Sequence, residues 1–173
     1  MKNVVILHNI RSALNVGAII RTVEGFGSEA VVFSGYTPRV RDERVLPHLR
    51  EKLDKQIHKT ALGAEKMVKN YAVEDILEEI RRFKNEGYTV VGLENNIRDE
   101  RLVSICSEEF SQKLTEKNVL ILGEEVGGIS RELFSVIDVF AEIPMTGRKE
   151  SFNVSVAAGI ALFQMNYGRK FGK

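Results

Sequence analysis

Residues whose types could do chemistry gather in three short segments of this 173-residue chain. Residues 9–21 read NIRSALNVGAIIR, residues 122–130 read LGEEVGGIS, and residues 143–155 read IPMTGRKESFNVS. Each segment combines glycine or loop-forming residues with amide, hydroxyl or charged side chains. Such groups bind ligands, orient a reacting group or stabilise developing charge. The elements around the segments decide whether the three meet.

The first segment places an amide and a guanidinium on one helix. Asn15 is a good N-cap for a helix that begins at Val16. Gly17 falls in the first turn, where Ala would be better by ~1 kcal/mol. Arg21 lies four residues further on and shares its face. We expect Gly17 to clear space for something to approach the backbone while Arg21 holds it. An exposed Arg beside a tolerated Gly is the competing interpretation.

The second and third segments are typical of ligand-binding loops. Residues 122–130 run from a strand into a glycine-rich turn, and glycine lets a ligand approach the backbone. Glu124 and Glu125 favour a cation or sugar hydroxyls there over phosphate; a turn with solvated acids is the alternative. In the third segment, Ser151, Asn153 and Ser155 converge at a helix start with free N–H groups. Helix capping explains one of these three residues.

The surrounding pattern predicts an α/β fold with a parallel sheet. Short apolar runs predict strands, and apolar residues at helical spacing predict helices between them. Expected strands cover residues 4–7, 30–33, 88–93, 119–122 and 139–143. Expected helices cover residues 16–26, 73–83, 130–136 and 151–167, with a helical turn at 64–70. Residues 36–63 are predicted to be a long, polar and basic loop.

The last expected helix is apolar on almost every side. Almost no polar face is left by its apolar residues, which are Phe152, Val154, Val156, Ala157, Ala158, Ile160, Ala161, Leu162, Phe163 and Met165. A helix of this kind must be buried on nearly all sides, and one sheet covers a single side. We therefore expect a subunit interface at this helix; a tightly wrapped helix in a monomer is the alternative.

Composition predicts one soluble domain over residues 1–173, without a membrane span and in a reducing cytoplasm. Hydrophobic residues make up 43%, and no apolar run reaches the ~18 residues of a span. A single cysteine, Cys106, excludes an internal disulfide, and the three histidines lack metal-ligand spacing. The net charge is +1, but residues 36–70 hold nine bases against five acids, and residues 74–109 hold ten acids against five bases.

One apparent cofactor motif is set aside. Residues 25–30, GFGSEA, match the dinucleotide-binding pattern by their letters. That pattern requires a strand before it and a helix after it, and here the order is reversed. A nucleotide-binding protein of another class, flavodoxin-like or a small dehydrogenase, therefore lacks a correctly placed phosphate motif.

Taken together, the three segments resemble the motifs of the SPOUT superfamily of RNA methyltransferases, in its SpoU/TrmH branch. The family's Asn-x-Gly-x-x-x-Arg stands here at residues 15–21, and its Leu-Gly-x-Glu-x-x-Gly at residues 122–128. Its Ile-Pro-Met followed by Ser-x-Asn-x-Ser stands at residues 143–145 and 151–155. The order and separations agree with the family over nearly the whole chain.

The resemblance implies a C-terminal deep trefoil knot and a homodimer packed through the last helix. It implies S-adenosyl-L-methionine (AdoMet) as the cofactor, with no metal, and methyl transfer to a ribose 2′-hydroxyl of RNA. The cofactor would lie against Leu93, Gly123, Ile143, Met145, Ser151 and Phe152. The catalytic set would be Arg21, Asn15, Glu125, Ser151 and Asn153. Arg21 would clamp a phosphate and stabilise charge on the 2′-oxygen.

The resemblance also indicates which substrate to expect and how it would be bound. Many relatives carry an added RNA-binding domain, which this sequence is expected to lack, so RNA would be gripped by the core dimer. The expected contacts are Arg39, Arg41, Arg44, Arg148, Lys149, Arg169 and Lys170. We expect tRNA as substrate; rRNA, methylation of a base nitrogen, and a knotted RNA-binding dimer without turnover are the alternatives.

Overall fold

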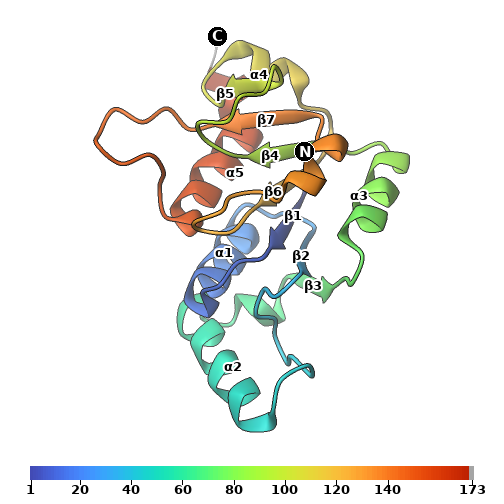
Figure 1. The fold of residues 1–173 in the computed structure, drawn as a ribbon, viewed down its shortest axis with the longest axis vertical. Helices are drawn as coiled ribbons and strands as arrows, with labels where there is room; N and C mark the ends of the chain where they lie inside the picture. The colour runs from blue at the N-terminus through green and yellow to red at the C-terminus, as the bar shows by residue number, and fades with distance from the viewer. Residues whose placement is uncertain (172–173) are drawn as a thin grey trace.

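A seven-stranded parallel sheet organises the molecule (Figure 1). The computed structural model describes residues 1–171, and side chains up to residue 168. The strands pair in the order β3-β2-β1-β6-β4-β7-β5, and every pair is parallel. Their bounds are β1 Lys2–His8, β2 Ala30–Ser34, β3 Lys69–Ala72, β4 Thr89–Leu93, β5 Leu102–Ser104, β6 Lys117–Leu122 and β7 Val139–Glu142. The predicted α/β class with a parallel sheet is confirmed.

Helices cover both faces of this sheet and create two apolar cores. One core joins the sheet to α1 (Ala13–Gly25), α2 (Pro47–Ala61), α4 (Glu108–Lys113) and α5 (Val154–Phe171). The other joins it to α3 (Ile76–Asn85) and the 3₁₀ segment η2 (Arg131–Val136). The central strands β1 and β6 are buried almost throughout, because apolar side chains on both of their faces meet a helical layer.

Helix α2 contradicts the predicted loop over residues 36–63. Pro47 occupies its first turn, where a missing N–H costs nothing, and Ile57 and Ala61 are buried against the core. The remaining positions carry many charged residues, which obscured the apolar stripe. Figure 1 shows α2 projecting at one end of the molecule, beyond β3.

The sequence also misplaced several boundaries. Strand β3 occupies part of the region expected as a helical turn, which the short 3₁₀ segment η1 (Ala64–Lys66) fills only in part. Strand β5 was not predicted, because three residues at a sheet edge give a weak pattern. Helix α1 begins at Ala13, and its N-cap is Ser12, whose hydroxyl accepts from the Asn15 N–H at 3.3 Å. The N-cap assignment of Asn15 is therefore wrong, and its side chain is available for other contacts.

No helix in residues 1–171 combines the length and apolarity that crossing a bilayer requires.

Candidate functional site

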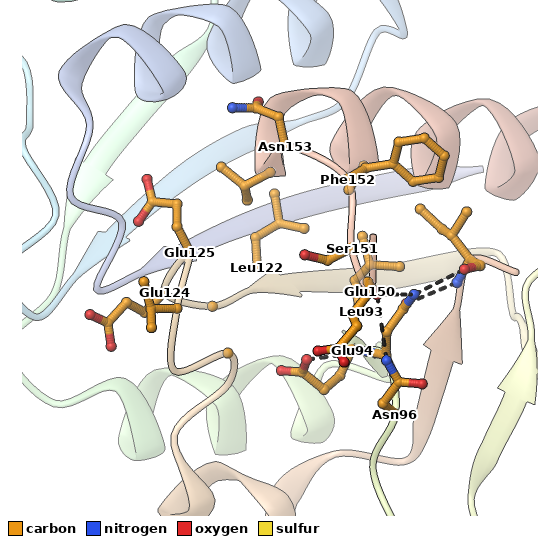
Figure 2. Close-up of a pocket in the computed structure, with 17 residues that line it drawn as sticks. Leu93, Glu94, Asn96, Leu122, Glu124, Glu125, Glu150, Ser151, Phe152 and Asn153 are labelled. Atoms are coloured by element: carbon orange, nitrogen blue, oxygen red, sulfur yellow. Dashed lines mark hydrogen bonds between the residues drawn. The ribbon is translucent and has the colours of Figure 1, made fainter. Parts of the chain in front are cut away.

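A pocket of about 340 Å³ lies at the carboxyl ends of β4 and β6 (Figure 2). Three chain segments that are distant in sequence form its walls. They are residues 93–96 after β4, residues 122–126 and 128 after β6, and residues 143, 150–154 and 157 leading into α5. Its size falls in the range of small-molecule sites, and this edge of a parallel sheet is where ligands bind.

The turn after β6 requires glycine at positions 123 and 128. A Cβ on Gly123 would lie 2.4 Å from the carbonyl of Gly128, and Gly128 itself has a φ of +67°. Glu124 and Gly128 exchange backbone hydrogen bonds of 3.0 and 2.9 Å across the turn. The turn therefore folds back tightly and presents bare backbone to the pocket.

Glu125 connects this turn to the first segment of the sequence. Its carboxylate accepts hydrogen bonds from the Arg11 N–H at 3.1 Å and from the Asn15 side-chain amide at 3.0 Å. Burial acts to raise the pKa of Glu125, but these hydrogen bonds outweigh it and the pKa lies below its usual value. Glu125 is therefore an anion held in place by donors. The neighbouring Glu124 forms an ion pair with Arg11.

Asn15 also connects to the third segment. The Asn153 side-chain amide donates to the Asn15 Oδ1 at 3.2 Å, and Asn153 Oδ1 accepts from both the N–H and the hydroxyl of Ser155. One hydrogen-bonded chain, Glu125–Asn15–Asn153–Ser155, thus joins all three segments at the edge of the pocket. Three residues of the expected catalytic set, Asn15, Glu125 and Asn153, are in this way connected to one another.

Asn95, which belongs to none of the three motifs, fixes the third wall of the pocket. Its side chain bonds both backbone groups of Ile143, donating to the carbonyl at 2.9 Å and accepting from the N–H at 3.1 Å. It also donates to the Glu150 carbonyl at 3.3 Å. An amide that follows a strand gives no motif by itself; only the fold shows that it holds the segment between β7 and α5.

The expected cofactor residues are mostly assembled here. Five of the six line the pocket: Leu93, Gly123, Ile143, Ser151 and Phe152. Met145 does not line it; it lies in the loop between β7 and α5, beyond the carbonyl that Asn95 holds. Figure 2 shows the carboxylates of Glu94, Glu124 and Glu125 along one side of the pocket, with the Phe152 ring across from them. The pocket therefore suits a ligand that has an apolar or aromatic part and a cationic part.

Arg21 and Gly17 have different surroundings from those expected. Arg21 is exposed on α1 and does not line the pocket of its own chain. Gly17 is buried, and the space above it is filled by α2, since a Cβ there would lie 2.2 Å from the Ile57 carbonyl oxygen. The expectation that Gly17 leaves room for a ligand is wrong; it leaves room for a helix.

Two of the arginines expected to contact RNA are committed to the fold. Asp42, which is 2% exposed, accepts from Arg44 Nη2 at 2.6 Å and from Arg39 Nε at 3.2 Å. Arg44 also donates to the carbonyls of Gly35 and Thr37. Arg41, by contrast, is exposed, as are Arg148 and Lys149. The side chains of Arg169 and Lys170 lie outside the described residues.

The Asp42 cluster predicts acid-sensitive stability. Hydrogen bonds from Arg44 hold the pKa of Asp42 at about 2, against 3.8 when unperturbed. Because the folded pKa is depressed, the stabilisation is present above pH 4 and disappears as the pH falls through 2. We expect Asp42→Asn to lower the free energy of unfolding by about 2 kcal/mol at pH 7, with a smaller loss near pH 3. Urea unfolding at both pH values, beside the exposed-neighbour control Glu43→Gln, measures this; equal losses at both pH values would contradict it.

No group of three or more His, Cys, Asp or Glu side chains that could hold a metal ion lies within residues 1–171.

The comparison with known proteins identifies the family. The model of the SpoU rRNA Methylase family matches residues 2–163, and the chain belongs to this family. It is 33% identical over 159 residues to the 23S rRNA (guanosine-2′-O-)-methyltransferase RlmB of Nitrosomonas europaea. The aligned residues make up 92% of this chain and 54% of that protein. It is 29% identical over 168 residues to the tRNA (guanosine(18)-2′-O)-methyltransferase of Aquifex aeolicus, 96% of this chain and 70% of that protein. The chain thus spans about half the length of the RlmB relatives.

Solved structures share the fold. An AdoMet-bound rRNA methyltransferase from Sinorhizobium meliloti matches with a TM-score of 0.76 and 23% identity, over 99% of this chain and 57% of that one. A structure described under the 2-OH methylation of C/U34 on tRNA matches with a TM-score of 0.74 and 17% identity, over 98% of this chain and 97% of that one. At these identities the likeness concerns the fold.

Proposed function

We propose that this chain is an AdoMet-dependent RNA methyltransferase that transfers a methyl group to a ribose 2′-hydroxyl, with tRNA as the substrate. The observation that carries this proposal is the hydrogen-bonded chain from Glu125 through Asn15 to Asn153, which unites the three motifs beside a pocket. The named relatives act at 2′-oxygens of rRNA or tRNA. The tRNA (guanosine(18)-2′-O)-methyltransferase of Aquifex aeolicus supports tRNA; rRNA, the substrate that the RlmB relatives are named for, is the alternative.

The pocket residues present fit AdoMet. Backbone groups of Leu93, Gly123 and Ile143 would hold the adenine, and Ser151 and Phe152 would close over the cofactor. The sulfonium of bound AdoMet supplies an activated methyl group. The chain's own task is to align a 2′-oxygen with that methyl group, because orientation can contribute about 7–11 kcal/mol to catalysis.

The polar network supplies the positioning. Asn15 and Asn153, tied to the anionic Glu125, would orient the ribose, with Ser151 beside them. Arg21 would clamp the phosphate of the target nucleotide and stabilise charge on the 2′-oxygen. A guanidinium is suited to this because it binds phosphate bidentately and stays protonated.

We also propose that residues 1–173 form one knotted domain that dimerises through α5 in the cytoplasm. Three facts support a threaded C-terminal segment: Asn95 holds residues 143 and 150, the turn after β6 packs beside them, and α5 follows at once. Support for the dimer comes from Val156 and Phe163 on α5, whose side chains are 49% and 48% exposed. An apolar stripe of this kind favours burial by a second copy.

Disrupting this stripe should separate the subunits. We expect Phe163→Asp to convert a dimer into a monomer at micromolar concentration, because a buried unpaired charge costs several kcal/mol. Light scattering after size exclusion measures the mass. Met67→Asp is the matched control, since Met67 is 74% exposed on another surface. A Phe163→Asp variant that stays dimeric would contradict the proposed interface.

The basic residues expected to bind RNA lie partly on helix α2 and not on a long loop. With Arg39 and Arg44 engaged internally, the exposed bases of this end are Arg41, Lys52, Lys55, Lys59, Lys66 and Lys69. Residues 46–69 hold six bases against three acids. We propose that RNA phosphates lie along this face and continue to Arg148 and Lys149.

Neutralising this face should weaken RNA binding through its salt dependence. We expect Lys59→Gln/Lys66→Gln to raise the Kd for RNA about tenfold at ~0.1 M salt and to reduce the slope of log K against log salt by about two. The Kd for AdoMet should not change. Filter binding over a salt series measures the slope, with exposed Lys113→Gln on α4 as control. An unchanged slope would remove α2 from the RNA path.

The activity itself is tested with methyl-labelled AdoMet and size-fractionated unmodified RNA, followed by nucleoside analysis. Label in a 2′-O-methylnucleoside from the tRNA fraction supports the proposal, and label from the rRNA fraction supports the alternative substrate. Label on a base contradicts the 2′-hydroxyl assignment. AdoMet binding without label in any fraction supports an RNA-binding dimer without turnover.

A further inference from the structure

The pocket is unusually acidic for its size. Four carboxylates line it, from Glu94, Glu124, Glu125 and Glu150, and no Lys, Arg or His stands among the described residues of its wall. Two of these charges are compensated: Glu124 pairs with Arg11, and Glu125 accepts from several N–H donors at the first segment. The remaining two carboxylates belong to Glu94 and Glu150.

Glu94 directly follows β4 and is half-buried, as is Glu124. Its carboxylate accepts from the Ile129 N–H at 2.7 Å and from the Asn95 N–H at 3.2 Å. Within the described part of the chain it has no cationic partner. Gly128 leaves room for this carboxylate, since a Cβ on that residue would lie 2.1 Å from Glu94 Oε2. Glu94 is therefore a carboxyl group that two backbone donors hold in place and that no cation of the described residues neutralises.

We infer that Glu94 makes this pocket discriminate between the methyl donor and its demethylated product. The inference rests on the proposed function, because it takes AdoMet as the ligand. Methyl transfer breaks the S–CH₃ bond and forms an O–CH₃ bond. The electron pair of the broken bond stays on sulfur, so the cationic sulfonium becomes a neutral thioether, and the 2′-hydroxyl proton leaves to solvent. The donor and S-adenosylhomocysteine otherwise carry the same charged groups, so an uncompensated carboxylate stabilises the donor specifically.

Burial strengthens this effect at Glu94 relative to Glu150. An interaction between charges grows as the local dielectric constant falls, and water screens a pair at the surface. Glu150 is exposed, whereas Glu94 is half-buried. Burial also raises the pKa of Glu94, against the effect of the two backbone N–H donors. A cationic ligand favours the ionised form, so bound donor and ionised Glu94 stabilise each other.

Two other roles for Glu94 would not discriminate. A hydrogen bond to the adenine or to the cofactor ribose would serve donor and product equally. A purely structural link between Asn95 and Ile129 would also affect both ligands equally when lost. The ratio of the two dissociation constants therefore isolates the charge effect from the other roles.

Calorimetric titration of the full chain tests the inference with three ligands. They are AdoMet, S-adenosylhomocysteine, and sinefungin, in which an amine-bearing carbon replaces the sulfonium. For Glu94→Gln we expect the Kd of AdoMet and sinefungin to rise about tenfold, and that of S-adenosylhomocysteine to change less than about twofold. Glu150→Gln should shift the ratio in the same direction by about two- to threefold. Exposed Glu116→Gln is the control for net charge.

The outcomes separate the alternatives. Equal losses for all three ligands in Glu94→Gln, with no shift in Glu150→Gln, would overturn the inference in favour of a structural role. Unchanged Kd values in both variants would overturn it as well. A wild-type chain that binds none of the ligands would contradict the proposed function itself, which distinguishes that failure from a failure of charge selection.

Discussion

Replacing Arg21 by Ala is expected to reduce methyl transfer about 10³-fold while leaving the Kd of AdoMet within about twofold. The two readouts separate because Arg21 is exposed on α1 and does not line the pocket of its own chain. In the proposed role Arg21 would act on the RNA, so loss of its guanidinium would remove both a phosphate clamp and charge stabilisation at the 2′-oxygen. Single-turnover rates with saturating RNA measure the first quantity, and calorimetry measures the second.

Two further variants make the Arg21 result specific. Arg21→Lys keeps the positive charge and loses the planar fork, so we expect most of the activity loss to persist. Arg81→Ala removes an exposed arginine from α3, on the other face of the sheet, and should leave turnover unchanged. Wild-type turnover in Arg21→Ala would exclude the role assigned to this residue.

Much of the fold is visible in the sequence because its physical causes are local. Continuous apolar strands alternate with helical stripes, and this alternation alone indicates a parallel sheet covered on both faces. The three motifs are equally visible, since a Gly-rich turn after a strand and polar residues at a helix start can be recognised before the fold is known. The connection between them, through Asn15, Glu125 and Asn153, depends on positions more than 100 residues apart.

What the sequence concealed is non-local. Asn95 and Glu94 follow a strand and resemble any polar loop; their roles come from backbone groups of Ile143 and Ile129 that the fold brings to them. Arg39 and Arg44 looked like free bases because nothing in their spacing shows the buried carboxylate of Asp42 between them. Charged residues hid the helix α2 in the same way, since only Ile57 and Ala61 are fully buried on it.

Gly17 shows that the structural reason for a glycine cannot be inferred from the motif in which it stands. The motif predicts a ligand beside this glycine, whereas the structure places it where α1 crosses α2. A Cβ at this position would meet both the carbonyl oxygen of Ile57 and the hydroxyl oxygen of Thr60 at 2.2 Å. That hydroxyl donates to the Leu14 carbonyl at 2.8 Å, so it links the two helices.

Gly17→Ala is therefore expected to destabilise the chain by about 2–3 kcal/mol, although alanine is the better helix former. The clash involves a backbone carbonyl, which no rotamer change can remove, so α2 must shift away from α1. A drop of roughly 5–10 °C in Tm would follow for a chain of this length. Gly25→Ala is the matched control on the same helix, because nothing lies within 4 Å of its Cβ position, and it should be neutral or stabilising. If both variants gave the same Tm, close packing against α2 could not be the reason for glycine at position 17, and a ligand near α1 would again be the better explanation.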